Sequence, residues 1–180
     1  GKLFCMKDYF AVLGLKRCPW METEALKEAF HRCAAANHPD GNGSDGQNFI
    51  EINQAWNILR EPASCLRHWL ELEVDGFQPS TIPSNDLMEI FQAVYTYTKA
   101  REEFGRKYAL AASSIHRALL QTHRAGLKKE GTTLLQKIQD EETSALNALR
   151  AADREVTPLT EIYNRLVFLT KWKTALEKAD

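Results

Sequence analysis

Apolar positions recur at helical spacing in the first third of the chain. From about residue 22 to residue 37 they follow the i, i+3, i+4, i+7, i+8 pattern of one buried helix face, at Leu26, Ala29, Phe30, Cys33 and Ala34. A second stripe runs from about residue 47 to residue 60 and carries Phe49, Ile52, Trp56 and Leu59. Turn-forming residues fill positions 40–46, so the pattern predicts two helices packed as an antiparallel hairpin.

The ends of these helices carry their own signals. Thr23, flanked by Glu22 and Glu24, is predicted to cap the first helix, where exposed amides favour a side-chain oxygen and negative charge. Pro39 prevents that helix from continuing, and Pro62 is predicted to end the second one.

Shorter segments flank the hairpin. Residues 8–15 are too few to be stable alone, so they must dock on it, and residues 63–72 predict one more short helix. Residues 74–84 hold a glycine and two prolines, which is typical of a domain boundary. We therefore expect a first domain over residues 1–75, a linker over 76–84 and a helical domain over 85–180.

The second part of the chain has helical periodicity throughout. A helix is expected to begin near Asp86, capped by Ser84 or Asn85, and residues 85–125 hold either one long helix or two. Breaks are predicted at Gly126 and Gly131. The last helix should start at the Thr157-Pro158 pair, with a core stripe at Leu159, Ile162, Leu166, Leu169 and Leu176. The expected fold class is all-α, with the hairpin domain followed by a C-terminal helical bundle.

His38, Pro39 and Asp40 stand together in the hairpin loop. Each suits a helix end by itself, because histidine favours the helix dipole, proline stops a helix and aspartate favours a turn. In this order, about thirty residues after the Asp8–Leu15 segment, they resemble the J-domain family over roughly residues 7–72. The resemblance implies that the tripeptide contacts the nucleotide-binding domain of a DnaK-type chaperone and promotes its ATP hydrolysis.

The first hairpin helix is less basic than in many J-domains. It carries only Lys27 and Arg32, which the resemblance places among the chaperone contacts, and Gly41 follows the tripeptide where many members have lysine. Electrostatic steering toward a chaperone should therefore be weak, which favours a dedicated partner.

The second hairpin helix, the junction that follows it and the helical second part together resemble the HscB co-chaperones of iron–sulfur cluster assembly. The resemblance rests on residues 52–56, 59–62, 69–70, 76–77, 87–89 and 163–169, followed by Lys171. It implies an HscA-type chaperone and an IscU-type scaffold bound by an apolar patch that includes Leu87, Met88 and Phe168. Phe91, where the family has an acidic run, is a further candidate for scaffold binding. Phe168 falls about half a turn from the core stripe, so its ring should be exposed. Tyr95 and Tyr97 could join the patch, but their spacing favours the core.

Net charge, apolar run length and cysteine spacing argue against several other classes of function. A net charge of -1 argues against a nucleic-acid binder, and no apolar run is long enough to cross a bilayer. Residues 1–10 lack a secretory signal, so we expect a soluble protein with no membrane partner. Its expected location is the cytoplasm of a bacterium, or the mitochondrial matrix in a eukaryote. Four cysteines without a Cys-x-x-Cys pair predict reduced thiols, no metal and no cofactor.

An enzyme is not expected. Pairing His38 with Cys33 or Asp40 would require a pocket that the loop does not offer, and Cys33 lies on the apolar stripe. His116 and His123 are seven residues apart, too far for an i, i+4 zinc pair, and should lie on the surface. Two alternatives stay open: a J-domain co-chaperone for another client, or a helical docking module in which His-Pro-Asp is vestigial.

Overall fold

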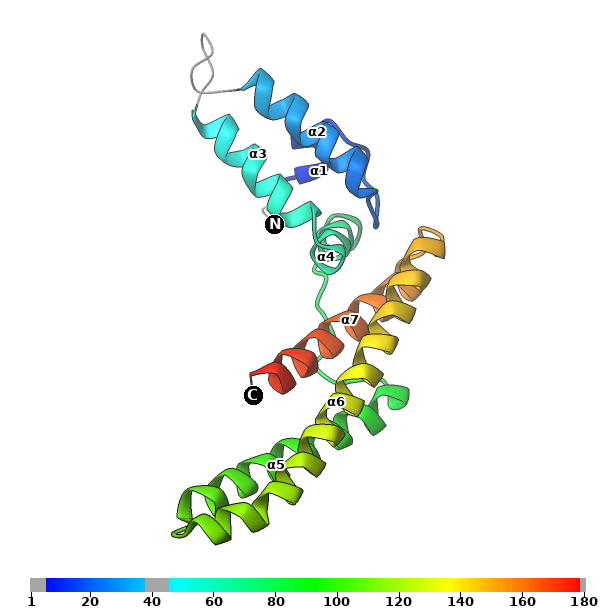
Figure 1. Cartoon of the computed structure of the whole chain (residues 1–180). Helices are drawn as coiled ribbons and strands as arrows, with labels where there is room; N and C mark the ends of the chain where they lie inside the picture. Colours follow the sequence, from blue (N-terminus) through cyan, green and yellow to red (C-terminus); the bar gives the residue numbers. More distant parts are fainter. Residues whose placement is uncertain (1–5, 38–45, 179–180) are drawn as a thin grey trace. The chain divides into compact units, whose positions relative to one another are not determined.

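The chain folds into helices joined by loops, with no strand among the residues that the computed structural model describes, 6–37 and 46–178 (Figure 1). The all-α fold class is confirmed. In chain order the elements are α1 (Tyr9–Val12), α2 (Thr23–Ala36), α3 (Gly46–Leu59), α4 (Pro62–Glu73), the 3-10 turn η1 (Asn85–Leu87), α5 (Met88–Leu110), α6 (Ser114–Ala151) and α7 (Val156–Glu177).

Packing divides the chain into two compact units. The first joins the chain up to Pro79 with Ala148–Tyr163, and the second joins Ser80–Asn147 with the chain from Asn164 onward. The change of unit at Ser80 lies inside the segment expected to be a linker. The division into domains at 75 and 85 stays a prediction, because a packing unit need not be a domain that folds alone.

The first unit is built around α3, which contacts α1, α2 and α4. Helices α2 and α3 lie side by side and antiparallel, as expected for the hairpin (Figure 1). Phe30 and Trp56 pack between them with ring centroids 5.0 Å apart. Burial of apolar side chains from four helices in one cluster is what holds these short helices in place. The buried members are Phe10, Leu13, Leu26, Ala29, Ile52, Ala55, Leu59, Cys65, Leu66, Trp69 and Leu70.

The short segment ahead of the hairpin docks as expected, and its start is held by Asp8. The Asp8 carboxylate accepts hydrogen bonds from the backbone amides of Phe10, at 3.0 Å, and Ala11, at 3.3 Å. Arg17 donates to the same carboxylate at 2.8 Å. Gly14 follows with φ +67°, a conformation that glycine adopts without strain, and lets the chain leave the helix.

The end of α6 and the start of α7 pack with the first unit. The guanidinium of Arg150 lies 5.6 Å from the centroid of the Trp20 ring, within the range of a cation–π contact. Arg67 of α4 donates a hydrogen bond to Tyr163 Oη at 3.4 Å, and the Tyr163 ring meets Phe77 edge-on.

The second unit is a bundle of α5, the larger part of α6 and the C-terminal part of α7. Its core joins Leu87, Ile90, Val94, Tyr97, Leu134, Ile138, Leu169, Trp172 and Leu176. Arg165 of α7 forms ion pairs with Asp86 in η1 and with Glu141 in α6, the latter at 2.9 Å. One guanidinium therefore ties three elements of this unit together.

Several helix ends differ from the sequence predictions. Residues 85–125 hold two helices, because the chain reverses at Ala111–Ser113. Gly126 and Gly131 do not break α6, since neighbouring helices can stabilise a helix across a glycine. Thr23 does not cap α2: it is the first helical residue, and the capping position is taken by Glu22 without a side-chain bond.

The remaining end predictions shift by a few residues. Pro62 ends no helix, because Leu59 is the last residue of α3 and Pro62 is the first residue of α4, where its missing N–H is not needed. Helix α7 begins at Val156, so Thr157 is not its cap. The predicted core stripe of this helix, from Leu159 to Leu176, is confirmed as buried.

Candidate functional site

The His38-Pro39-Asp40 motif lies outside the described residues, so its position is defined by the helices on either side of it. Helix α2 ends at Ala36, and Asn37 closes it: its backbone amide bonds to Cys33 O at 3.1 Å and its side-chain Nδ2 donates to the same carbonyl at 2.9 Å. The next helix, α3, begins at Gly46. The motif therefore belongs to the connection between two packed antiparallel helices.

Lys27 and Arg32, the predicted basic contacts, both lie exposed on α2. Five residues correspond to a rotation of about 140° round the helix axis, so the two side chains point to different sides of the exposed surface. Lys27 also forms an ion pair with Glu24 at 3.4 Å. The structure therefore does not bring these two cations into one basic patch, and their chaperone contact stays a prediction.

His68 of α4, which the sequence did not single out, holds the start of α1. Its Nε2 accepts a hydrogen bond from the backbone amide of Tyr9 at 3.0 Å, and its ring stacks on Phe10 with centroids 5.4 Å apart. The side chain is 3% exposed. Burial lowers the pKa of His68, an effect that the nearby carboxylates of Asp8 and Glu71 oppose in part. A neutral imidazole is thus part of the support of the hairpin.

The carboxylate of Asp8 forms the charged edge of this support. Burial alone would raise the pKa of Asp8, but hydrogen bonds from Arg17 and from the amides of Ala11 and Phe10 outweigh it and lower the pKa. Arg17 also reaches Glu73 at 3.3 Å, so it links α4 to the start of α1. The helices α1 and α4, which flank the hairpin, are therefore joined to each other by polar contacts as well as by the shared core.

The four predicted scaffold-binding residues lie in different environments in the second unit. Leu87 is 1% exposed and belongs to the core, whereas Met88 is half-buried and Phe91 is 40% exposed. The rings of Phe91 and Phe168 both lie beside Trp172, with centroid distances of 6.0 and 5.8 Å. Met88, Phe91 and Phe168 therefore remain available at the junction of α5 and α7, while the side chain of Leu87 does not.

The expectation that Phe168 is exposed is wrong in part. Its ring is half-buried against the core, because Trp172, one helical turn later, supplies a partner that the distance from the leucine stripe did not reveal. The expectation for the tyrosines holds only for Tyr97, which is 5% exposed, whereas Tyr95 is 59% exposed. Tyr95 lies one turn after Phe91 on the same side of α5, so it extends the aromatic surface.

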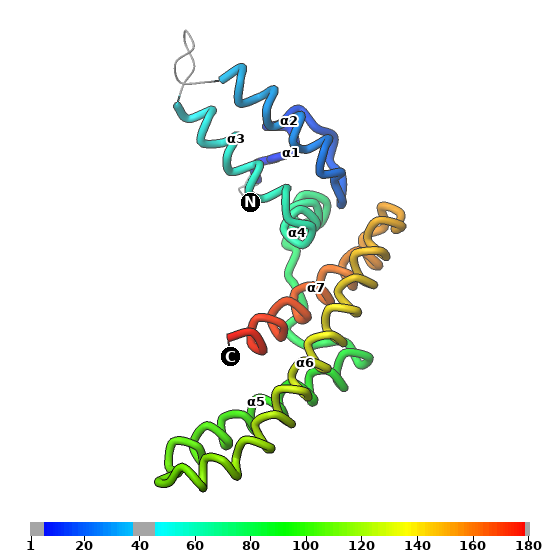
Figure 2. Tube along the Cα trace, viewed as in Figure 1, coloured from blue at the N-terminus to red at the C-terminus, as the bar shows by residue number. Residues whose placement is uncertain are grey.

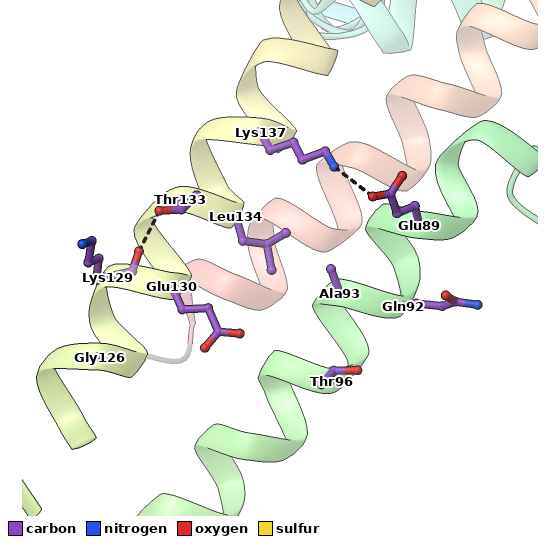
Figure 3. A pocket seen from close by; sticks show the side chains of 10 residues that line it. All are labelled: Glu89, Gln92, Ala93, Thr96, Gly126, Lys129, Glu130, Thr133, Leu134 and Lys137. Carbon is purple, nitrogen blue, oxygen red and sulfur yellow. Dashed lines mark hydrogen bonds and ion pairs between the residues drawn. The ribbon is translucent and has the colours of Figure 1, made fainter.

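A groove of ≈ 650 Å³ runs between α5 and α6 (Figure 3). Its lining from α5 is Glu89, Gln92, Ala93 and Thr96, on a side of the helix separate from Phe91 and Tyr95. Lys137 of α6 spans the groove to pair with Glu89 at 3.7 Å (Figure 3). The second unit thus presents two different surfaces along α5, one aromatic and one mixed polar.

The other sequence expectations concern thiols, histidines and metals. Cys18, Cys33 and Cys65 are free, and burial raises the pKa of the Cys65 thiol to about 12, so it is a packed core group. His116 and His123 lie on the surface, as predicted. Within residues 6–37 and 46–178, no group of three or more metal-ligating side chains comes together. No helix in the same ranges is long and apolar enough to span a membrane.

Comparison with known families identifies the N-terminal helices of the first unit. The DnaJ domain family matches residues 8–67, which covers α1 to α3 and the first half of α4. A J domain is therefore present in this chain. The match ends before η1 and α5 to α7, so it assigns no role to the second unit.

Individual relatives share the same kind of domain. A 58-residue stretch is 43% identical to a tetratricopeptide repeat and J domain-containing co-chaperone of Mycosarcoma maydis, covering 32% of this chain and 10% of that protein. A 64-residue stretch is 39% identical to the chaperone protein DnaJ of Nostoc punctiforme, covering 34% of this chain and 16% of that protein. The chain spans only a small part of the length of these relatives.

Proposed function

We propose that this chain is a co-chaperone that stimulates ATP hydrolysis by a DnaK-type chaperone and brings it a client. The observation that carries the proposal is the His38-Pro39-Asp40 sequence in the connection between α2 and α3 of a J domain. The relatives that share this domain are named as chaperones or co-chaperones, which supports the same role.

In this proposal the chain performs no reaction of its own. Pro39 fixes one backbone dihedral between an imidazole and a carboxylate, and Asp40 can accept charge-assisted hydrogen bonds from a partner arginine. A contact of this kind shifts a two-state chaperone only if it binds one state better than the other. Hydrolysis itself belongs to the chaperone, so the chain acts as a regulator and not as an enzyme.

Steady-state ATP hydrolysis by a DnaK-type chaperone tests the proposal. The chain should accelerate turnover, and His38→Gln should abolish the acceleration without changing the helical circular dichroism. His116→Gln is the matched control, because it removes an exposed imidazole from α6. Stimulation that survives His38→Gln would instead favour a docking module with a vestigial motif.

Lys27 and Arg32 are proposed as secondary contacts. Each is exposed on α2, so alanine at either position should leave stability within about 0.5 kcal/mol. Because the two side chains point to different sides of the helix, only the one that faces the chaperone should matter. We expect one variant to need more protein for half-maximal ATPase stimulation and the other to match the unmodified chain.

The client is proposed to be an IscU-type scaffold of iron–sulfur cluster assembly, working with an HscA-type chaperone. Phe91 and Phe168 support this proposal, because their rings lie beside Trp172 at the junction of α5 and α7, and Tyr95 extends this aromatic surface. Met88, half-buried at the start of α5, is proposed as an apolar neighbour of that surface. Exposed apolar surface of this kind is typical of partner sites. Leu87 would act indirectly, by fixing the start of α5 in the core. Such a set of partners would work in the bacterial cytoplasm or the mitochondrial matrix.

The scaffold proposal has its own test. With an HscA-type chaperone, the scaffold and the chain together should stimulate ATP hydrolysis more than the sum of their separate effects. Phe91→Ala should remove this synergy and leave stimulation by the chain alone intact. Ile82→Ala is the control, since Ile82 is 69% exposed but precedes η1. Stimulation without synergy would keep the co-chaperone role and assign another client to the second unit.

A further inference from the structure

The end of the α5–α6 hairpin, residues 104–124, exposes large aliphatic side chains. The chain reverses at Ala111–Ser113, where the hairpin of α5 and α6 ends (Figure 2). Leu110 is 82% exposed, Ile115 is 74% exposed and Leu119 is 73% exposed, whereas Ala111 between the helices is 2% exposed. We call residues 104–124 the hairpin tip.

The packing contacts of the hairpin tip are made by aromatic side chains and do not involve Leu110, Ile115 or Leu119. The ring of Phe104 lies against Tyr108, with centroids 6.0 Å apart, and meets His123 of α6 edge-on at 5.1 Å. The contact between Phe104 and His123 joins the two helices across the tip. Leu110, Ile115 and Leu119 point outward, so their exposure is not the result of an unfilled core.

The charged side chains of the hairpin tip are all positive. The tip contains Arg106, Lys107, Arg117 and Arg124 and no aspartate or glutamate, although the whole chain has a net charge of -1. All four cations are exposed. Lys107 pairs with Glu103, just outside the tip, at 3.1 Å. Lys107 and, to a smaller extent, Arg106 lower the pKa of the Glu103 carboxyl, so Arg106 also lies near that acid. Among the described residues no ion pair joins Arg117 or Arg124 to an acid.

We propose that the hairpin tip binds the surface of a membrane that contains anionic phospholipids. Aliphatic side chains at the end of a projecting hairpin can enter the boundary between headgroups and acyl chains, and the flanking cations then meet the lipid phosphates. The binding is peripheral and reversible, and it involves only the surface of the bilayer. It is independent of the co-chaperone role proposed for the J domain.

Other occupants fit the hairpin tip less well. A second copy of the chain would bring two basic tips together, and their repulsion opposes association. A single-stranded nucleic acid would use the cations, but its bases stack on exposed aromatic rings, and the rings of Phe104 and Tyr108 in the tip are half-buried. Aliphatic exposure combined with cations therefore favours a lipid surface.

Sedimentation with vesicles tests the proposal. The chain should bind vesicles in which a third of the lipid is phosphatidylglycerol and should not bind vesicles of phosphatidylcholine alone. Binding should weaken as salt is added, because the tip cations are exposed. Each of Arg117→Gln and Arg124→Gln should weaken binding about fivefold, the effect of one cation near an anionic surface. Arg154→Gln is the control, since Arg154 is exposed but lies between α6 and α7.

The aliphatic part of the site is tested by Leu110→Ser combined with Leu119→Ser. Both side chains are exposed, so the variant should keep its helical circular dichroism and its ATPase stimulation while losing most of its vesicle binding. Failure to bind the anionic vesicles, or binding that all tip variants retain, would overturn the proposal. A preference for single-stranded RNA over vesicles, lost with the arginines and kept without the leucines, would replace the membrane by a nucleic acid.

Discussion

The ring of Tyr97 on α5 occupies the space that a side chain at Gly131 on α6 would need. A Cβ built on Gly131 would lie 2.6 Å from Tyr97 Cζ and closer still to its hydroxyl. Tyr97 is 5% exposed and belongs to the core of the second unit, so a displacement of its ring would disturb that core. The glycine inside α6 is thus explained by close approach of a neighbouring ring.

This relationship predicts a destabilising Gly131→Ala substitution. Overpacking a core costs about 1–3 kcal/mol, which should exceed the gain of about 1 kcal/mol from replacing glycine inside a helix. Gly126→Ala, with no atom within 4 Å of its Cβ, should show only the gain. Urea denaturation of both variants measures the difference. A stabilising Gly131→Ala would disprove the role of Tyr97, and a Tyr97→Leu, Gly131→Ala double variant should recover part of the loss.

The lowered pKa of the buried His68 predicts that the first unit loses stability in acid. The pKa of His68 is lowered in the folded chain, so below about pH 6.5 the unfolded state binds a proton that the folded state does not, and the free energy of unfolding falls as pH falls. Protonation would also remove the acceptor of the Tyr9 amide. Denaturation midpoints measured between pH 7 and pH 5 should fall for the unmodified chain. The slope of the denaturation midpoint against pH should flatten in His68→Gln. It should stay unchanged in His31→Gln, the control, because His31 is exposed.

The lowered pKa of Asp8 predicts a second loss of stability at a more acidic pH. Because the pKa of Asp8 is lowered on folding, its contribution is present above the unfolded value of about 3.9 and disappears as pH falls through the folded value. At neutral pH, Asp8→Ala should cost about 1 kcal/mol, the usual loss for a helix cap. Asp75→Ala, at an exposed position after α4, is the control. Equal stability of the two variants in urea would show that the Asp8 contacts are not maintained in solution.

Leu87 and Phe91 should separate stability from client binding. Leu87→Ala removes a core side chain and should lower the free energy of unfolding by about 2–5 kcal/mol. Phe91→Ala removes a ring that is 40% exposed and should cost clearly less, while any effect on the scaffold is direct. Thermal unfolding followed by circular dichroism distinguishes the two. If Phe91→Ala costs as much as Leu87→Ala, the aromatic surface is part of the core.

The hairpin of the J domain could be predicted from the sequence because its signals are local. The stripes from Leu26 to Ala34 and from Phe49 to Leu59 gave helices that the structure bounds within one residue or so of the expected ends. The short segments on either side were found for the same reason. His68 was missed as a support because nothing near it in the sequence shows that its partner is the amide of Tyr9, 59 residues earlier.

The second unit was predicted less well. Periodicity continued from Phe104 through Ala111 to Leu119, so it did not reveal the reversal at Ala111–Ser113. The glycines at 126 and 131 looked like breaks because helix propensity is a local quantity, whereas α6 is stabilised by packing against other helices. Phe168 and Tyr95 were assigned to the wrong environments because burial depends on which side chains other helices bring near.

By itself, the sequence determined that the chain is helical, where the hairpin lies and that His38, Pro39 and Asp40 occupy its connection, because spacing and turn chemistry act between residues a few positions apart. Only the tertiary structure decided that Leu87 lies in the core, that Phe91 and Tyr95 are exposed, and that Leu110, Ile115 and Leu119 project from a basic hairpin tip. The reason is that burial and local charge are set by neighbours distant in sequence, and a helical repeat does not specify those neighbours.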